Sequence, residues 1–207
     1  SSEMVSQLAN AIITYLFNII MMQLVGEHGV AAITILLYGQ FLFNAFYLGF
    51  TIGISPIVGF QYGARDKQKL RNIYHTSFLF VAVSSVFMAV IAIVLSPTIV
   101  TIFTDDPATY ELAAVGFRLF AINFLFSGIS ITSSGFFTAL SNGTISAVIS
   151  FCRTLGFIVL SLLILPKFLG ITGAWIAIPV AEFCTLLVAG VMHFVYFWKP
   201  GIRNYLR

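Results

Sequence analysis

Six long apolar segments run along the chain, separated by short turns or by clusters of charge. Each is at least about 20 residues long, the length that a helix needs to cross a hydrocarbon core of about 30 Å. They lack the period-two alternation of transmembrane strands. Because lipid offers backbone groups no hydrogen-bond partner, the pattern predicts an all-α integral membrane protein whose six transmembrane helices form one bundle. We place the helices at 4–24, 30–60, 73–103, 112–140, 144–165 and 170–197.

Turn and charge signals separate these segments. Asp105 and Asp106 precede Pro107, a combination that is typical of a helix start. In LPKFLG (165–170), the proline is expected to end one helix before the next begins. These signals mark the breaks between the segments.

The composition supports lipid as the solvent of this chain. Hydrophobic residues make up 59% of it, charged residues only 8%, and the mean hydropathy is +1.02. A soluble domain is about a quarter charged and just under half apolar. A water-soluble fold is therefore excluded as an interpretation.

Positive charge is concentrated in GARDKQKLRN (63–72). Because successive connections fall on alternate sides of the bilayer, one side receives seven basic residues and the other receives Lys167 alone. The seven are Arg65, Lys67, Lys69, Arg71, Lys199, Arg203 and Arg207. The positive-inside rule then predicts a plasma-membrane protein with both termini and residues 63–72 in the cytoplasm. The basic run is interpreted as an anchor at membrane lipid, and no aromatic platform for nucleic acid accompanies it.

Polar residues inside three segments recur every three or four positions, so each set lies on one face of its helix. The sets are Gln7, Asn10, Thr14 and Asn18; Gln40, Asn44, Tyr47, Thr51 and Ser55; and Asn123, Ser127, Ser130, Ser134 and Thr138. Either these stripes line a hydrated substrate path, or they are packing seams, since small polar residues are common between membrane helices. The Asn and Gln side chains, with four hydrogen-bonding sites each, favour the path.

Two charged residues lie deep in their segments. At about 1.5 Å per residue, Arg153 and Glu182 both lie roughly 15 to 18 Å from a membrane surface, near the midplane. Because an unpaired charge there costs several kcal/mol, we predict an Arg153–Glu182 ion pair between adjacent helices. Its role is either structural or functional.

The sequence contains no glycine-rich phosphate loop, no HExxH or CxxC pattern and no Ser/His/Asp grouping. His75 and His193 lie near the predicted cytoplasmic boundary and are expected at the interface rather than as metal ligands. We therefore expect neither an enzyme, nor a cofactor, nor a metal site.

Three stretches carry a family resemblance. They are GFTIGISPIVGFQYGARD (49–66), SSGFFTALSNGTISAVISFCR (133–153) and LPKFLGITGAWIAIPVAEF (165–183). Together the segments resemble the C-terminal six-helix half of the multidrug and toxic compound extrusion (MATE) antiporters, closest to a bacterial branch with DNA-damage-inducible-type members. The resemblance covers essentially the whole chain.

The resemblance implies a twelve-helix, two-bundle protein that exchanges cations for amphipathic, often cationic, small molecules. This chain would pair with an N-terminal six-helix half, or self-associate in its place. The cleft between the bundles is lined mainly by the first, second and fourth helices of each. The implied cavity residues are therefore Asn18, Gln40, Asn44, Tyr47, Asn123 and Ser127.

One feature departs from the family pattern. Many members bind the coupling cation through carboxylates in the first and fourth helices of this half, where the present chain has Ala11 and Ser127. The coupling ion, Na⁺ or H⁺, would then bind in the N-terminal half. Two other functions stay open: a flippase for lipid-linked precursors from the same superfamily, and a six-helix membrane protein without transport.

Overall fold

The computed structural model describes residues 2–198, with side chains from residue 8 to residue 196. The described part is helical throughout, apart from short connections, and contains no strand, so the all-α prediction is confirmed. Its elements are α1 (Ser2–Val25), α2 (Glu27–Gly63), α3 (Lys67–Phe103), α4 (Pro107–Phe120), the 3₁₀ turn η1 (Ala121–Asn123), α5 (Phe124–Ala139), α6 (Gly143–Phe151), the π-helical turn η2 (Cys152–Gly156) and α7 (Phe157–Trp198).

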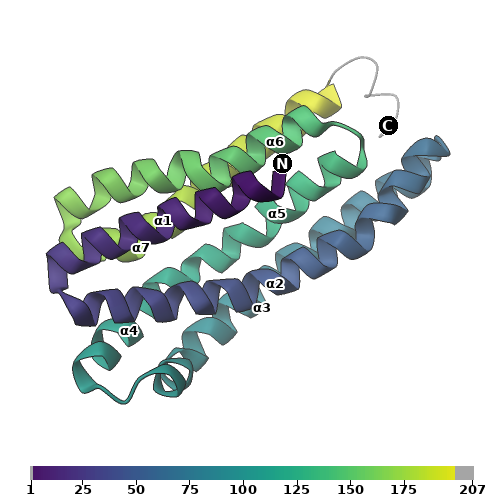
Figure 1. Cartoon of the computed structure of the whole chain (residues 1–207). Helices are drawn as coiled ribbons and strands as arrows, with labels where there is room; N and C mark the ends of the chain where they lie inside the picture. Colours follow the sequence, from purple (N-terminus) through teal and green to yellow (C-terminus); the bar gives the residue numbers. More distant parts are fainter. Residues whose placement is uncertain (1, 199–207) are drawn as a thin grey trace.

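The long helices lie side by side in an elongated bundle, and their connections alternate between its two ends (Figure 1). The start of α1, the α2–α3 connection and the α5–α6 connection point to one end. The α1–α2 and α3–α4 connections lie at the other. This arrangement is the one that the sequence predicts for a multi-pass bundle.

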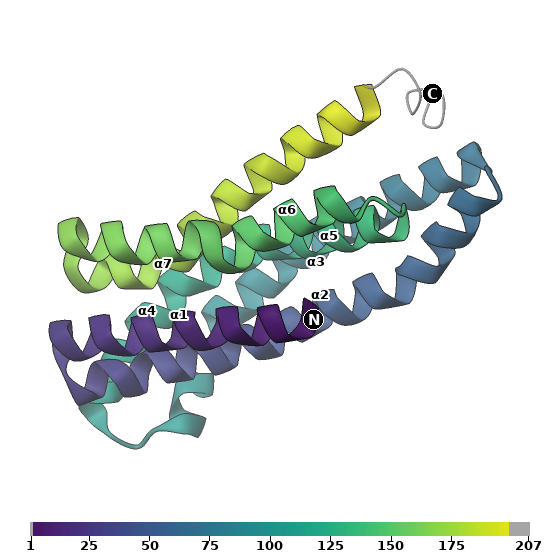
Figure 2. The ribbon, with the colours of Figure 1, turned by 45° about the horizontal axis from the view of Figure 1, so that its top comes forward.

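The predicted helices appear as five continuous spans, because the last two are merged into one. In the part of the chain that the structure describes, five helical spans are long and apolar enough to cross a membrane, and the last, from Gly143 to Tyr196, contains two helices. Inside it Gly170 has the non-helical angles φ 58° and ψ −134°, where the chain folds back on itself (Figure 2). Pro166 stays inside the helix, so the predicted stop falls four residues too early. Because glycine has no Cβ, it adopts a positive φ without steric strain, and this backbone conformation reverses the chain at Gly170. Pro166 does not reverse the chain.

The fourth span begins earlier than predicted because Asp106 caps it. Its carboxylate accepts hydrogen bonds from the backbone N–H of Thr109 at 2.9 Å and from the Thr109 hydroxyl at 2.7 Å. Pro107 occupies the first helical turn, where its missing N–H costs nothing. Helix α4 therefore starts at residue 107 instead of 112, and η1 joins it to α5.

The basic segment 63–72 is mostly helical rather than a loop. Only residues 64–66 separate α2 from α3. Asp66 caps α3 by accepting from the backbone N–H of Lys69 at 3.0 Å, and it pairs with the Lys69 ammonium at 3.1 Å. Lys67, Lys69 and Arg71 thus project from the first two turns of α3, and they are exposed together with Arg65.

The bundle interior is filled by aromatic side chains. Phe17, Phe117, Phe120 and Phe124 are fully buried, and they belong to one core together with Trp175. Close packing of this kind stabilises association between membrane helices, because lipid supplies no hydrophobic driving force between them.

The outer surface of the bundle exposes many large apolar side chains. Large side chains such as Phe41, Ile52, Ile102 and Phe168 are each at least 70% exposed. Monomeric soluble proteins rarely expose contiguous apolar surface on this scale. The surface is suited to lipid.

Candidate functional site

Helices α2 and α5 are joined by polar contacts at the centre of the bundle. The Tyr47 hydroxyl on α2 donates to the carbonyl oxygen of Phe124 at 3.2 Å, and the Thr51 and Thr132 hydroxyls lie 3.3 Å apart. All these side chains are buried. Part of the polar stripe on α2 therefore forms a packing seam, which is one of the two interpretations that the sequence left open.

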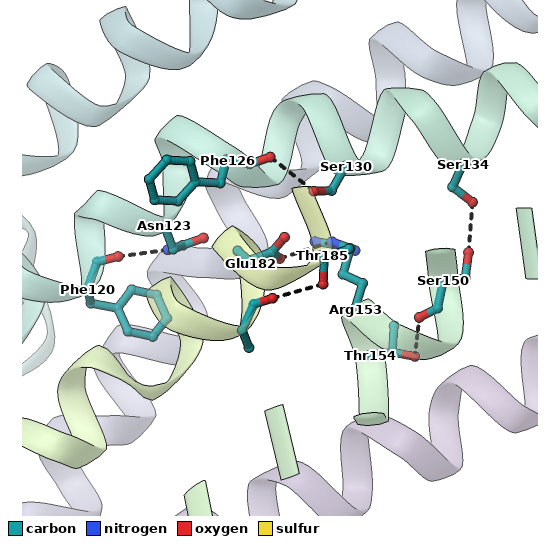
Figure 3. A network of polar contacts seen from close by, with 11 residues as sticks. Phe120, Asn123, Phe126, Ser130, Ser134, Ser150, Arg153, Thr154, Glu182 and Thr185 are labelled. Carbon is teal, nitrogen blue, oxygen red and sulfur yellow. Dashed lines mark hydrogen bonds and ion pairs between the residues drawn. The ribbon is translucent and has the colours of Figure 1, made fainter. Parts of the chain in front are cut away.

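The stripe on η1 and α5 also faces inward. Asn123 and Ser127 are fully buried. The side-chain N–H of Asn123 donates to the carbonyl oxygen of Phe120 at 2.8 Å, and the Ser130 hydroxyl donates to that of Phe126 at 3.2 Å (Figure 3). Within residues 8–196, the carbonyl oxygen of Asn123 and the hydroxyl of Ser127 have no hydrogen-bond partner.

Helices α5 and α6 share a cluster of hydroxyl groups near the turn that connects them. The Ser134 oxygen lies 2.7 Å from that of Ser150 and 3.0 Å from that of Ser146, and Thr138 reaches Ser146 at 2.7 Å. Small side chains and mutual hydrogen bonds let the two helices approach closely. Ser134 and Thr138 are therefore packing residues in this structure.

Arg153 and Glu182 form the ion pair that the depth of the two charges predicts. The guanidinium Nε lies 2.9 Å from the carboxylate Oε1, and the side chains are 18% and 1% exposed, respectively. The pair joins η2 to the second arm of α7, beyond Gly170 (Figure 3). The other carboxylate oxygen, Oε2, accepts no hydrogen bond from the part of the chain whose side chains are described.

The backbone that carries Arg153 has an unexpected form. Residues Cys152–Gly156 form a π-helical turn between α6 and α7. Such turns are rare and occur frequently at functional sites. Sequence reasoning missed it, since no residue pattern distinguishes a π turn from continuing α-helix here.

The family model described as MatE matches residues 4–163. The chain belongs to the MatE family. Among curated relatives, Multidrug and toxin extrusion protein 1 of Homo sapiens is 27% identical over 146 residues, which are 68% of this chain and 25% of the relative. The protein of the same name from Pongo abelii has the same identity and coverage.

Solved structures of the MatE family share the fold. A multidrug resistance MATE family transporter in its outward-facing conformation has a TM-score of 0.85 and 20% identity, over 97% of this chain and 44% of that one. The Vibrio cholerae MATE transporter VcmN in its bent form has a TM-score of 0.86 and 19% identity, over 99% and 46% of the two chains. The MatE chain thus spans about a quarter of its curated relatives and less than half of these solved transporter chains.

The predicted cavity residues divide into two groups in this MatE bundle. Tyr47, Asn123 and Ser127 are fully buried inside it, where they do not reach an outer surface that a second bundle could face. Their side chains fill the seams between helices of this half. Asn18 and Asn44 are half-buried on α1 and α2, and the carbonyl oxygen of each lacks a hydrogen-bond partner among the described side chains.

Gln40 completes the second group. It is half-buried on α2, four residues and so about one turn before Asn44. A surface hollow of about 550 Å³ on the MatE bundle is lined by residues of α6 and contains none of the six predicted residues. Its lining residues are Gly143, Thr144, Ala147, Val148 and Phe151.

His193 is half-buried between helices near the end of α7. Its ring packs against Phe78 and Phe137, and its Nε2 lies 3.1 Å from the Ser133 hydroxyl. The imidazole thereby links α7 to α3 and α5. His75 is exposed, and the basic residues Lys199, Arg203 and Arg207 lie outside the described residues.

Proposed function

We propose that this chain is the C-terminal six-helix half of a cation-coupled multidrug efflux antiporter. One observation carries the proposal: nearly the whole chain superposes on less than half of a multidrug transporter chain, at a TM-score of 0.85. The remaining length of such a transporter corresponds to a second bundle of similar size. The partner of this chain is therefore an N-terminal six-helix half, or a second copy in its place.

The substrates that fit the surface are amphipathic or cationic small molecules. On α1, the exposed Tyr15 lies three residues before Asn18, and on α2 the exposed Phe41 lies three residues before Asn44. Residues three apart on a helix are neighbours, so each amide stands beside an aromatic ring. Aromatic faces attract organic cations, and a few polar groups orient a ligand in an apolar pocket. Asn18, Gln40 and Asn44 are the cavity residues that we retain.

The orientation follows from the distribution of basic residues. Arg65, Lys67, Lys69 and Arg71 project from one end of the bundle, the end where α1 begins. From the positive-inside rule we infer that this end faces the cytoplasm, and we propose a bacterial-type plasma membrane as the location. Transport then consists of alternating access of the cleft between two bundles to the two sides of the membrane.

Drug efflux by the full-length protein tests the proposal. The double substitution of Gln40→Leu and Asn44→Leu is expected to abolish efflux and drug resistance while expression is retained, because it removes the polar groups of the cleft without reducing side-chain volume. Gln61→Leu, the same change near the cytoplasmic end of α2, is the matched control and is expected to leave efflux unchanged. Resistance that survives the double substitution contradicts the cavity assignment.

Neither alternative gains support. A flippase for lipid-linked precursors calls for several cationic residues in its cavity, and none of the six cavity candidates is cationic. A six-helix protein without transport predicts that Asn18, Gln40 and Asn44 face dry partner helices, so that the Leu substitutions leave no transport phenotype. The efflux assay separates these outcomes.

A further inference from the structure

Glu182 is the one carboxylate of the sequence that lies far from a helix end. It follows Gly170 by 12 residues and precedes Trp198 by 16, which correspond to about 18 Å and about 24 Å of helix. The other acidic residues lie in connections or in the first two turns of their helices: Glu3, Glu27, Asp66, Asp105, Asp106 and Glu111. Carboxylates at this depth in a membrane protein commonly mark ion pathways or proton relays.

The carboxylate of Glu182 has an ion-pair partner but no hydrogen bond. Oε1 lies 2.9 Å from the Arg153 Nε, and neither Oε1 nor Oε2 accepts a hydrogen bond from residues 8–196. The side chain is 1% exposed. A buried ion pair repays its desolvation only when the remaining lone pairs are also satisfied, and here they are not. This geometry suits a carboxylate that alternates between a charged, paired form and a neutral, protonated form.

Arg153 is the charged group that faces Glu182. Helix α7 packs against α1, α4, α5, α6, η1 and η2, and it also touches α3 at His193, eleven residues beyond Glu182. Besides Arg153, the titratable side chains described on the first six of these elements are Tyr15, Tyr110, Glu111, Arg118 and Cys152. Of these groups, Arg153 is the one at ion-pair distance from the carboxylate.

A proton fits this site better than a metal cation. A guanidinium 2.9 Å from the carboxylate repels any cation that needs several oxygen ligands close to Glu182. A proton instead needs one free oxygen, which Oε2 supplies, and it removes the carboxylate charge that holds Arg153.

We propose that Glu182 is the proton-binding carboxylate of this half, and that its protonation releases Arg153. A hydronium ion transfers its proton to Oε2 and leaves water; the carboxylate becomes a neutral carboxyl group, and the attraction to Arg153 ends. Loss of the proton to the opposite compartment restores the pair. Since Arg153 lies on the π-helical turn after α6, its release uncouples this turn from the second arm of α7. The assignment of H⁺ as the coupling ion rests on the proposed transport function.

Infrared titration of the purified full-length protein in liposomes tests the site without requiring transport. Acidification is expected to produce an absorption of protonated carboxyl groups, and Glu182→Gln is expected to remove one component of it. Glu111→Gln, which changes an exposed carboxylate of α4, is the matched control and is expected to keep that component. Identical spectra for Glu182→Gln and the wild type overturn the inference.

Further variants guard against a folding defect. The double substitution Arg153→Glu and Glu182→Arg exchanges the two charges and keeps a buried ion pair. It is expected to restore the infrared absorption component that Glu182→Gln loses. If the exchange does not fold, the double substitution of Arg153→Gln and Glu182→Gln, which leaves no unpaired charge, replaces it and is expected to lack the component. A component that persists in this neutral double variant belongs to another carboxyl group and contradicts the proposal.

A transport measurement distinguishes failure of this inference from failure of the proposed function. In Glu182→Gln, a pH gradient is expected to stop driving drug efflux, while drug exchange at equal pH on both sides persists. Equal pH-driven efflux in the variant and the wild type overturns the role of Glu182 only. A wild type driven by a Na⁺ gradient and not by protons also overturns it. A wild type that exports no drug overturns the proposed function, and the infrared titration still tests the site.

Discussion

The Tyr47 hydroxyl of α2 donates a hydrogen bond to the carbonyl oxygen of Phe124, the first residue of α5, at 3.2 Å. Phe124 directly follows the 3₁₀ turn at Ala121–Asn123, where the regular hydrogen bonding of the α-helix is interrupted. A side chain from one helix thus satisfies a backbone group at the irregular point of another. This contact fixes α2 against the 3₁₀ turn in the fourth span.

Tyr47→Phe removes this hydrogen bond and leaves the ring in place. A net hydrogen bond contributes about 0.5–1.5 kcal/mol, so the free energy of unfolding in detergent is expected to fall by about that amount. Tyr38→Phe is the matched control, since Tyr38 lies on the same helix and is 60% exposed. A Tyr47→Phe protein as stable as the control contradicts the role of the contact.

Gly128 allows α2, α3 and α5 to meet. A Cβ at this position would lie 2.5 Å from the Tyr47 ring and 2.6 Å from the Ser85 hydroxyl oxygen. Overpacking of a close-packed core costs about 1–3 kcal/mol, so Gly128→Ala is expected to lower the thermal unfolding temperature. Gly49→Ala, in α2 where nothing lies within 4 Å of the new Cβ, is expected to leave it unchanged or raise it. Equal effects of the two substitutions contradict this packing.

The pH dependence of stability at the end of the bundle that carries the α3–α4 connection follows from Asp106. Hydrogen bonds from the Thr109 hydroxyl and backbone N–H, and next the adjacent His28, lower the pKa of the Asp106 carboxyl. The ionised cap therefore stabilises the fold above the ordinary aspartate pKa of about 3.9, and this contribution is lost as the pH falls through the lower folded-state value.

Asp106→Asn is expected to reduce this loss of stability on acidification, because asparagine caps a helix well and does not titrate in this range. Unfolding of the purified protein, followed from neutral pH to below about pH 4, measures the difference. Asp105→Asn changes the neighbouring exposed carboxylate and serves as the control. If Asp105→Asn and Asp106→Asn reduce the loss of stability on acidification equally, the helix cap at Asp106 is not the cause of that loss.

Orientation in the membrane is checked by cysteine labelling from one side. Ala64→Cys, between α2 and α3, is expected to react with a membrane-impermeant thiol reagent only from the cytoplasm, because basic residues flank it. Ala108→Cys, at the opposite end of the bundle, is expected to react only from outside. Both positions are exposed. The opposite labelling pattern contradicts the predicted topology, whatever the substrate is.

The sequence by itself determined the class of fold and the pairing of the deep charges. Segment length, apolar composition and helical spacing are properties of the chain alone, and lipid permits few backbone solutions for them. The cost of a lone charge near the midplane required a partner, and the chain offers Arg153 and Glu182 to each other. The helix start at Pro107 was also signalled, although the boundary was placed five residues late.

Only the tertiary structure decided which polar residues face inward. Periodicity places Gln40, Asn44 and Tyr47 on one stripe, but α5 covers Tyr47 and leaves the other two half-buried. The π turn at Arg153 and the reversal at Gly170 likewise depend on what packs around them. Periodicity specifies a helix face, whereas burial depends on which neighbour covers that face, and that neighbour is distant in the sequence.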